Sequence, residues 1–113
     1  MAYLYYGNET NPAEIPDRLL AHVKVVAATK LRRNESFLLS WRHPGEGAEG
    51  RTSIWMQPAI PLRFVFESAE PDVLDAEFLR TLANEATTSR GIVLEWDDEP
   101  ASINASHRQA VAA

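Results

Sequence analysis

The sequence predicts an α+β fold, a two-layer sandwich whose mainly antiparallel sheet carries two helices on one face. Apolar residues alternate in five short segments and follow helical spacing in two longer ones, in the order β-α-β-β-β-α-β. The 113 residues suffice for one domain, and a hydrophobic fraction of 45% is typical of a folded protein rather than a disordered one. A sheet with one covered face follows from this order of elements.

The first strand and the first helix are predicted in the N-terminal third of the chain. Residues 2–6 alternate and are rich in tyrosine, which favours a strand, and residues 7–12 have the composition of a turn. Pro16 suits the first turn of a helix, where Asp17 interacts favourably with the helix dipole. The helix is predicted to continue to about Arg33 along an apolar stripe of Leu19, Leu20, Val23, Val26, Ala27 and Leu31.

Three strands are predicted next, over residues 35–42, 51–57 and 62–67, each with alternating apolar residues. Residues 43–50 separate the first two strands and are rich in glycine, which predicts a loop. The glycines match the pattern G-x-G-x-x-G of dinucleotide-binding loops. A strand follows them, however, instead of the helix whose N-terminus would hold a pyrophosphate. The segment is therefore interpreted as a hairpin connection.

The second helix is predicted to begin at Asp72 or Asp75, since both are suitable N-cap residues, and to end near Thr87. Its apolar stripe consists of Leu74, Phe78, Leu79, Leu82 and Ala86. Gly91 lies beyond the end of this helix, where glycine is common. The last strand is predicted over residues 92–96.

The predicted single domain spans residues 1–96, and residues 97–113, acidic and then alanine-rich, are predicted to form a flexible C-terminal tail. The chain contains no cysteine, which favours the reducing cytoplasm for a domain of this size. No apolar stretch approaches the ~20 residues of a membrane helix, so we expect no membrane partner. The three histidines are far apart, which predicts no metal site, and no motif predicts a cofactor.

Strand alternation divides the large side chains of the predicted sheet between two faces. The face predicted to be covered carries Phe37, Leu39, Trp41, Ile54, Met56, Leu62, Phe64, Phe66, Ile92, Leu94 and Trp96. The opposite face brings together Arg42, Arg51, Trp55 and Arg63, with His43 at a strand end as a further contact residue. An indole that stacks on a base and arginines that hold phosphates suit a nucleic acid, and the same residues suit a protein partner or a second copy of the chain. The third interpretation is an ordinary solvated face.

A second candidate surface is the outer side of the first helix, where helical spacing places Arg18, His22, Arg32 and Arg33. The distribution of charge agrees with a basic half. Residues 17–66 contain eight Lys and Arg against four Asp and Glu, whereas residues 67–99 contain two against ten. Either the basic half has an anionic partner, or both halves face only solvent. The net charge of −5 argues against a general nucleic-acid binder.

An enzymatic function is the alternative to a binding function. It would require a pocket with ionisable side chains, for which His22, His43, Arg42 and Glu35 are the candidates. No Ser-His-Asp arrangement is indicated, because Ser40 and His43 lack the sequence context of a nucleophile elbow. The residues therefore predict no catalytic group.

Several runs of residues resemble a family of small bacterial proteins without an established function. They are LAHVKVV at 20–26, TKLRRNESF at 29–37, SWRHP at 40–44, SIW at 53–55 and PAIPLRFVF at 58–66. The resemblance covers about residues 3–96. Members of that family often carry the label ATP-dependent DNA ligase, which implies a DNA-related accessory role. The Lys-x-Asp-Gly motif of such ligases is absent, because Lys24 precedes Val-Val and Lys30 precedes Leu-Arg.

Overall fold

The computed structural model describes residues 1–42 and 50–96 of the chain. Within these residues it contains β1 (Ala2–Tyr6), β2 (Ala13–Ile15), α1 (Asp17–Arg32), β3 (Phe37–Arg42), β4 (Arg51–Met56), β5 (Leu62–Val65), α2 (Ala76–Ala86) and β6 (Ile92–Leu94). The predicted α+β class and the order of the predicted elements are confirmed, with the short strand β2 in addition. The predicted tail over residues 97–113 and nearly all of the predicted glycine-rich loop lie outside the described residues.

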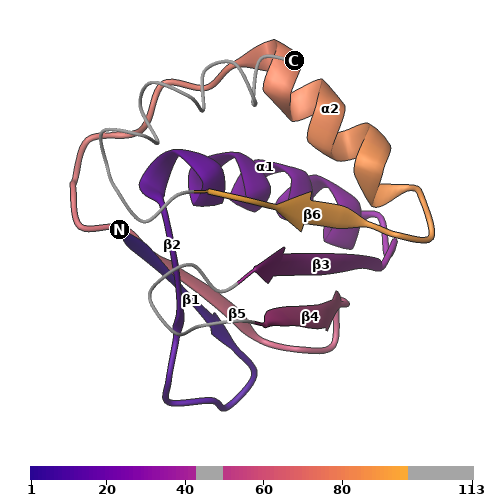
Figure 1. Ribbon diagram of the computed structural model, residues 1–113, viewed down its shortest axis with the longest axis horizontal. Coiled ribbons are helices and arrows are strands. Elements are labelled where there is room, and N and C mark those ends of the chain that lie inside the picture. Colours follow the sequence, from indigo (N-terminus) through magenta and orange to yellow (C-terminus); the bar gives the residue numbers. More distant parts are fainter. Residues whose placement is uncertain (43–49, 97–113) are drawn as a thin grey trace.

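The strands form two three-stranded sheets (Figure 1). In sheet A, β1 lies between β2 and β5 and runs antiparallel to both. In sheet B, β3 lies between β4, which is antiparallel to it, and β6, which is parallel to it. The strand pairing is thus mainly antiparallel, as predicted. The parallel pair joins strands that are far apart in the chain, as parallel neighbours must be, because a crossover has to connect them.

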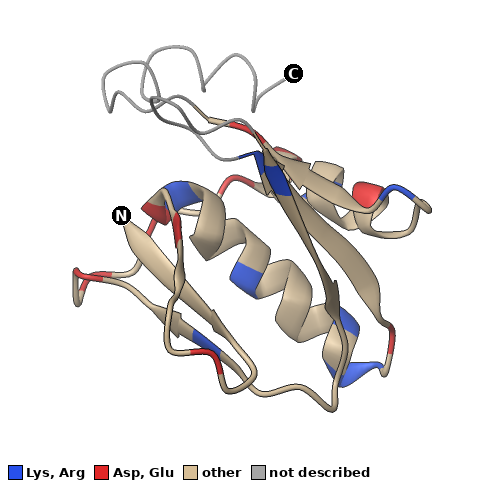
Figure 2. Ribbon diagram, turned by 60° about the horizontal axis from the view of Figure 1, so that its bottom comes forward, with Lys and Arg blue, Asp and Glu red and all other residues tan. Residues whose placement is uncertain are grey.

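Helix α1 lies between the two sheets (Figure 2), and α2 packs against α1, β3 and β6. This central position buries more of α1 than one amphipathic stripe would. The buried residues of α1 are Leu19, Leu20, Ala21, His22, Val23, Val26 and Ala27. All of the predicted stripe except the half-buried Leu31 is therefore buried, and Ala21 and His22 are buried in addition.

The apolar residues predicted for one sheet face contribute to the core from both sheets. On sheet B, Phe37, Leu39, Trp41, Met56, Ile92 and Leu94 are buried, whereas Ile54, Leu62, Phe64, Phe66 and Trp96 are half-buried against the same core. Pro58 and Pro61 stand between β4 and β5, where a missing backbone N–H ends a ladder. The chain leaves sheet B at this point, and β5 pairs with β1 instead.

Local signals place the ends of both helices. The carboxylate of Asp75 accepts hydrogen bonds from the backbone N–H groups of Glu77 and Phe78 at 2.9 and 3.3 Å, so Asp75 rather than Asp72 is the N-cap of α2. Beyond α1, Asn34 adopts a left-handed conformation with φ 64°. Asparagine tolerates this conformation better than most residues, and it ends the helix.

Gly91 introduces β6 at a position that no other residue fits. Its φ is 77°, and a Cβ atom built there would lie 2.2 Å from the backbone oxygen of Leu38 in β3. The missing side chain thus lets the chain approach β3 closely before the parallel pairing begins.

Candidate functional site

Three cross-strand pairs of β3 and β4 lie on the outer face of sheet B, beside Val93 of β6. The register pairs Leu38 with Trp55, Ser40 with Ser53 and Arg42 with Arg51. Because residues two apart on a strand share a face, these side chains lie on one side, in rows about 7 Å apart. The face therefore runs from an apolar and aromatic row, through a serine row, to a basic row.

Trp55 is the large aromatic side chain of this face, and it is 53% exposed. The hydroxyl of Tyr6, in sheet A, donates a hydrogen bond to the backbone oxygen of Trp55 at 2.6 Å. This bond fixes the backbone from which the indole projects. Trp41, one strand away, is only 8% exposed, which confirms that alternation separates the two tryptophans between the core and the outer face.

Arg42 and Arg51 form the basic row, at the end of β3 and the start of β4 (Figure 2). Both are exposed, and neither forms an ion pair with a carboxylate among the described residues. Like charges directly opposite each other on antiparallel strands repel. The serine row beside them has short side chains, and the hydroxyls of Ser40 and Ser53 form a hydrogen bond with each other at 2.7 Å.

Arg63 does not join this row, because it belongs to sheet A. The register pairs it with Tyr5, and its guanidinium carbon lies 4.1 Å from the centroid of the Tyr5 ring. This distance is that of a cation–π interaction, so the charge of Arg63 already has a partner. His43, the other contact residue predicted for the face, lies outside the described residues.

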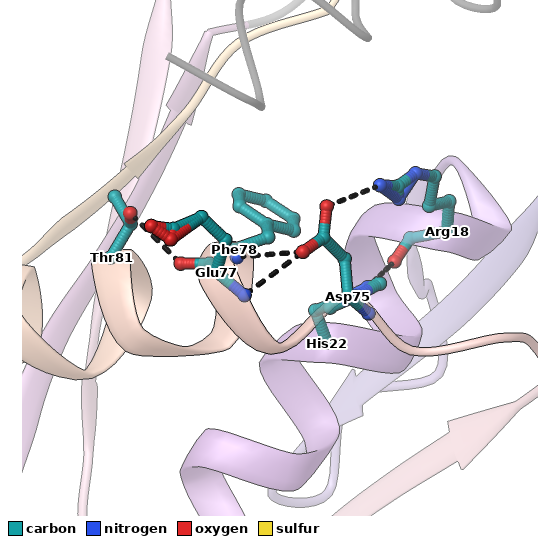
Figure 3. A network of polar contacts seen from close by, with 6 residues as sticks. All are labelled: Arg18, His22, Asp75, Glu77, Phe78 and Thr81. Atoms are coloured by element: carbon teal, nitrogen blue, oxygen red, sulfur yellow. Dashed lines mark hydrogen bonds and ion pairs between the residues drawn. The ribbon is translucent and has the colours of Figure 1, made fainter.

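The predicted surface along α1 is corrected at His22, which is fully buried. Its Nε2 accepts a hydrogen bond from the backbone N–H of Asp75 at 2.9 Å, and its Nδ1 lies 2.7 Å from the backbone oxygen of Arg18 (Figure 3). Because Nε2 accepts, Nδ1 carries the proton and donates it to the Arg18 oxygen. The imidazole is therefore neutral, and it joins α1 to the N-terminus of α2.

The electrostatics of this joint follow from its geometry. Burial lowers the pKa of His22, and the hydrogen bond to Arg18 and the carboxylates of Asp75 and Asp72 oppose that shift in part. The backbone N–H groups of Phe78 and Glu77 lower the pKa of Asp75. Arg18 lies 3.4 Å from Asp75 and 5.8 Å from the centroid of the Phe78 ring. Arg18 and His22 thus have structural partners in α2.

Arg32 and Arg33 are exposed at the C-terminal end of α1, where Lys30 also pairs with Glu35 at 3.4 Å (Figure 2). Positive charge is favourable at a helix C-terminus, which explains this group locally. The exposed large apolar side chains of the described chain are Met1, Trp55, Val73 and Leu74, and none of these belongs to α1. The end of α1 therefore lacks the aromatic contact that sheet B offers.

Three of the hollows in the described surface bear on an enzymatic function. The one of about 500 Å³ lies between α2 and β6, the one of about 490 Å³ lies between the β1–β2 hairpin and sheet B, and the one of about 310 Å³ lies between α1 and residues 66–74. His22, Arg42 and Glu35, which an enzyme would need, line none of these three.

Residues 1–42 and 50–96 contain neither a metal-binding cluster nor a membrane-spanning helix. No three His, Cys, Asp or Glu side chains there gather closely enough to hold a metal ion. No helix in those ranges has the length and apolar character needed to cross a membrane.

Glu85 is a notable residue that the sequence interpretation did not single out. Helical spacing places it three positions after Leu82 and seven after Phe78, on the inner side of α2. Its Oε1 atom is buried and has no hydrogen-bond partner in the described structure. Burial raises the pKa of Glu85, and the backbone N–H of Val93 and the guanidinium of Arg90 act against this shift. Its spacing from Phe78 and Leu82 is the signal that points to it.

Comparison with known proteins adds a family but no activity. Residues 1–97 match a family model described as a domain of unknown function, DUF7882. No curated protein matches the chain. No solved structure matches it either.

Proposed function

This chain belongs to the DUF7882 family of domains of unknown function, and we propose that it is a binding module whose sheet B outer face engages an anionic protein or nucleic-acid partner. The observation that carries the proposal is the exposed indole of Trp55 on the same face as Arg42 and Arg51, which form no ion pair within residues 1–42 and 50–96. An indole and two arginines at fixed spacing form a surface with both an apolar and a cationic end.

A partner on this face would gain free energy at both ends, from burial of the indole and from neutralisation of the two arginines. The indole of Trp55 leaves about half of its surface in water, and burial of a large aromatic side chain is worth about 1.5–3 kcal/mol. The two guanidinium groups repel each other across the strands. An anion between Arg42 and Arg51 together with an apolar or aromatic group on Trp55 would relieve both.

The spacing of the rows defines the shape of such a partner. Two row steps separate the arginine pair from Trp55, which amounts to about 13 Å along the strands. A single-stranded nucleic acid fits this pattern, with a base stacked on the indole and phosphates at the arginines. A protein segment with an apolar anchor followed by carboxylates fits it as well, since Trp and Arg dominate many protein interfaces.

The test is a binding titration of the full chain with labelled single-stranded DNA, single-stranded RNA and an Asp- and Glu-rich peptide, at about 50 and 200 mM salt. Trp55→Ala should weaken binding by about 1–3 kcal/mol for each base that stacks there. Exchange of both Arg42 and Arg51 for Gln should weaken it and reduce the salt dependence, because phosphate contacts are lost. Arg80→Gln, on the exposed side of α2, is the matched control.

The outcomes separate the partners. Preference for DNA over RNA supports a DNA-related accessory role, and preference for the acidic peptide supports a protein partner. Light scattering measures self-association of the same samples, and a dimer abolished by Trp55→Ala would replace the anionic partner with a second copy. Absence of binding to all three probes at low salt, or equal binding by the variants and the control, contradicts the proposal.

A further inference from the structure

The hollow between α2 and β6 lies at the β6 edge of sheet B, on the other side of β3 from β4. Its volume is about 500 Å³, and its apolar lining comes from α1, α2 and β6, with Leu19, Phe78, Leu82 and Leu94. These four side chains are nearly completely buried, so they form a rigid floor. A volume of this size accommodates a small organic molecule.

Glu85 gives this hollow a specific polar feature. Its carboxylate faces the backbone N–H of Val93 in β6, but its Oε1 atom is buried without a hydrogen-bond partner in the described structure. A buried acceptor without a partner costs about 1–3 kcal/mol, and more when the group is charged. Glu85 lines the hollow, and a rotation of its side chain that turns Oε1 into the hollow would let a ligand with an N–H donor satisfy this acceptor.

Two of the hydroxyl groups that line the hollow, those of Thr81 and Thr88, already donate their protons within α2 and just beyond it. Thr81 donates to the backbone oxygen of Glu77 at 3.1 Å, and Thr88 donates to that of Glu85 at 2.7 Å. The Thr81 oxygen keeps its lone pairs for a ligand, whereas the Thr88 oxygen already accepts from the backbone N–H of Gly91 at 3.1 Å and keeps one. Glu95 adds a second, exposed carboxylate at the rim. The lining thus favours a donor.

Arg90 is the cation of the lining. It is exposed, and it lies beyond ion-pair distance of every carboxylate in the described chain. It lowers the cation affinity of the hollow through its charge alone, and solvent screens that effect.

From this arrangement we infer that the hollow between α2 and β6 is a second binding site, for a primary ammonium group carried on an aliphatic chain. The side chain of Glu85 rotates so that Oε1 enters the hollow, the ammonium donates to this oxygen, and the aliphatic chain lies on the apolar floor. Three donors on a compact cation suit one carboxylate oxygen and the nearby threonine lone pairs. The same chemistry occurs in a free alkylamine and in a lysine side chain of a partner.

The experiment titrates hexylammonium chloride into the full chain, with binding followed by backbone amide chemical shifts and by calorimetry. Shifts should concentrate in α2 and β6. Hexanol and hexanoate, which have the same chain without the cation, should bind at least about tenfold more weakly. Nα-acetyl-lysine amide and a lysine-containing peptide test the second source, and tighter binding of either one identifies a protein side chain as the ligand.

Three variants decide the role of Glu85. Glu85→Gln keeps the shape and an acceptor but removes the charge, and it should weaken hexylammonium binding about tenfold to a hundredfold. Glu77→Gln, exposed on the same helix and outside the hollow, should leave binding unchanged. Arg90→Gln should strengthen binding by up to about fivefold, because it removes the competing charge.

A readout of protons separates binding at Glu85 from apolar binding alone. Where Glu85 is protonated in the empty protein, hexylammonium should displace that proton, so the heat of binding depends on the ionisation enthalpy of the buffer. Circular dichroism confirms that each variant is folded. Equal binding of hexylammonium and hexanol, unchanged binding by Glu85→Gln in a folded protein, or no shifts in α2 and β6 overturns the inference.

Discussion

Sheets A and B each turn an arginine-containing aromatic face outward, but they treat the arginines differently. On sheet A, Arg63 lies opposite Tyr5 and stacks on its ring at 4.1 Å. On sheet B, Arg42 lies opposite Arg51, and the aromatic residue Trp55 is two rows away. In sheet A the arginine is thus paired with an aromatic ring, whereas in sheet B neither arginine has an ion-pair partner within the described part of the chain.

This difference shows that composition does not identify a binding surface. Both faces contain an arginine and an aromatic residue, and the decisive fact is which residues the register places opposite each other. A shift of register changes every cross-strand pair of a face. The comparison therefore makes predictions about stability as well as about binding.

The largest predicted effect separates the two faces of sheet B. Trp41→Ala removes a buried indole from the core and should lower the free energy of unfolding by about 3–5 kcal/mol. Trp55→Ala, on the neighbouring strand β4, removes a half-exposed indole and should lower the free energy of unfolding by less than about 1 kcal/mol. Urea denaturation followed by circular dichroism measures both. Similar losses for the two variants would contradict the assignment of Trp55 to a binding role.

A second pair of variants compares glycines next to the two sheets. Gly91→Ala introduces a Cβ atom 2.2 Å from the Leu38 oxygen at a φ of 77°, and should cost at least about 2 kcal/mol. Gly7→Ala, at φ 65°, has its closest contact 3.7 Å away at Ile60, so it should cost about 1 kcal/mol. Thermal unfolding of both variants tests this ranking, and the reverse order would show that β6 does not approach β3 as described.

Charge reversal should change stability in opposite directions on the two sheets. Arg51→Glu replaces a repulsive pair with an attractive one and should stabilise the fold by about 0.2–1 kcal/mol, while it weakens the binding of anions. Arg63→Glu removes the stacking on Tyr5 and should destabilise the fold by about 0.5–1 kcal/mol. Chemical denaturation at low salt gives both signs. A loss of stability in Arg51→Glu would mean that the arginine row already has a partner within the protein.

The pH dependence should distinguish the binding face from the joint between the helices. The lowered pKa of His22 means that the unfolded chain binds a proton more readily than the folded one below pH 6.5. The contribution of His22 to the free energy of unfolding is therefore fully present above pH 6.5, and it is lost as the pH falls through the pKa of His22 in the folded state. Binding to DNA on sheet B, measured with His43→Gln so that the predicted contact residue His43 does not titrate, should stay constant over the same interval, because arginines and phosphates do not titrate there. His22→Gln should flatten the stability profile, and an unchanged profile would contradict the buried neutral imidazole.

Much of this fold follows from local signals. Alternation, helical spacing and the N-cap residue Asp75 predict seven elements close to their observed ends. The strand β2 is only three residues long and lies beside Pro12, so its composition resembles a turn, and its pairing with β1 depends on tertiary contact. Alternation also shows which side chains face the core, but not which strands are neighbours. The alternation of apolar residues therefore could not predict that the strands divide into two sheets.

The same limit applies to the candidate site. Arg42, Arg51 and Trp55 were predicted on one face because they belong to a single hairpin, whose register is local. Arg63 was grouped with them because alternation places its side chain on the polar side of its strand, although that strand pairs with β1 in sheet A. His22 was placed on the surface because helical spacing describes one covered side, whereas α1 is covered by the sheets and by α2.

The parallel pairing of β3 with β6 sets the order in which the domain can fold. During synthesis, the β3–β4 hairpin leaves the ribosome before β6 does. The edge of β3 that later pairs with β6 therefore has no partner strand during this time. Bringing β6 next to β3 closes a long loop, and the entropy cost of this closure precedes the contacts between the two strands that offset it. We therefore expect the insertion of β6 to be the slow step of folding, and until it occurs the nascent chain presents an open strand edge to other chains.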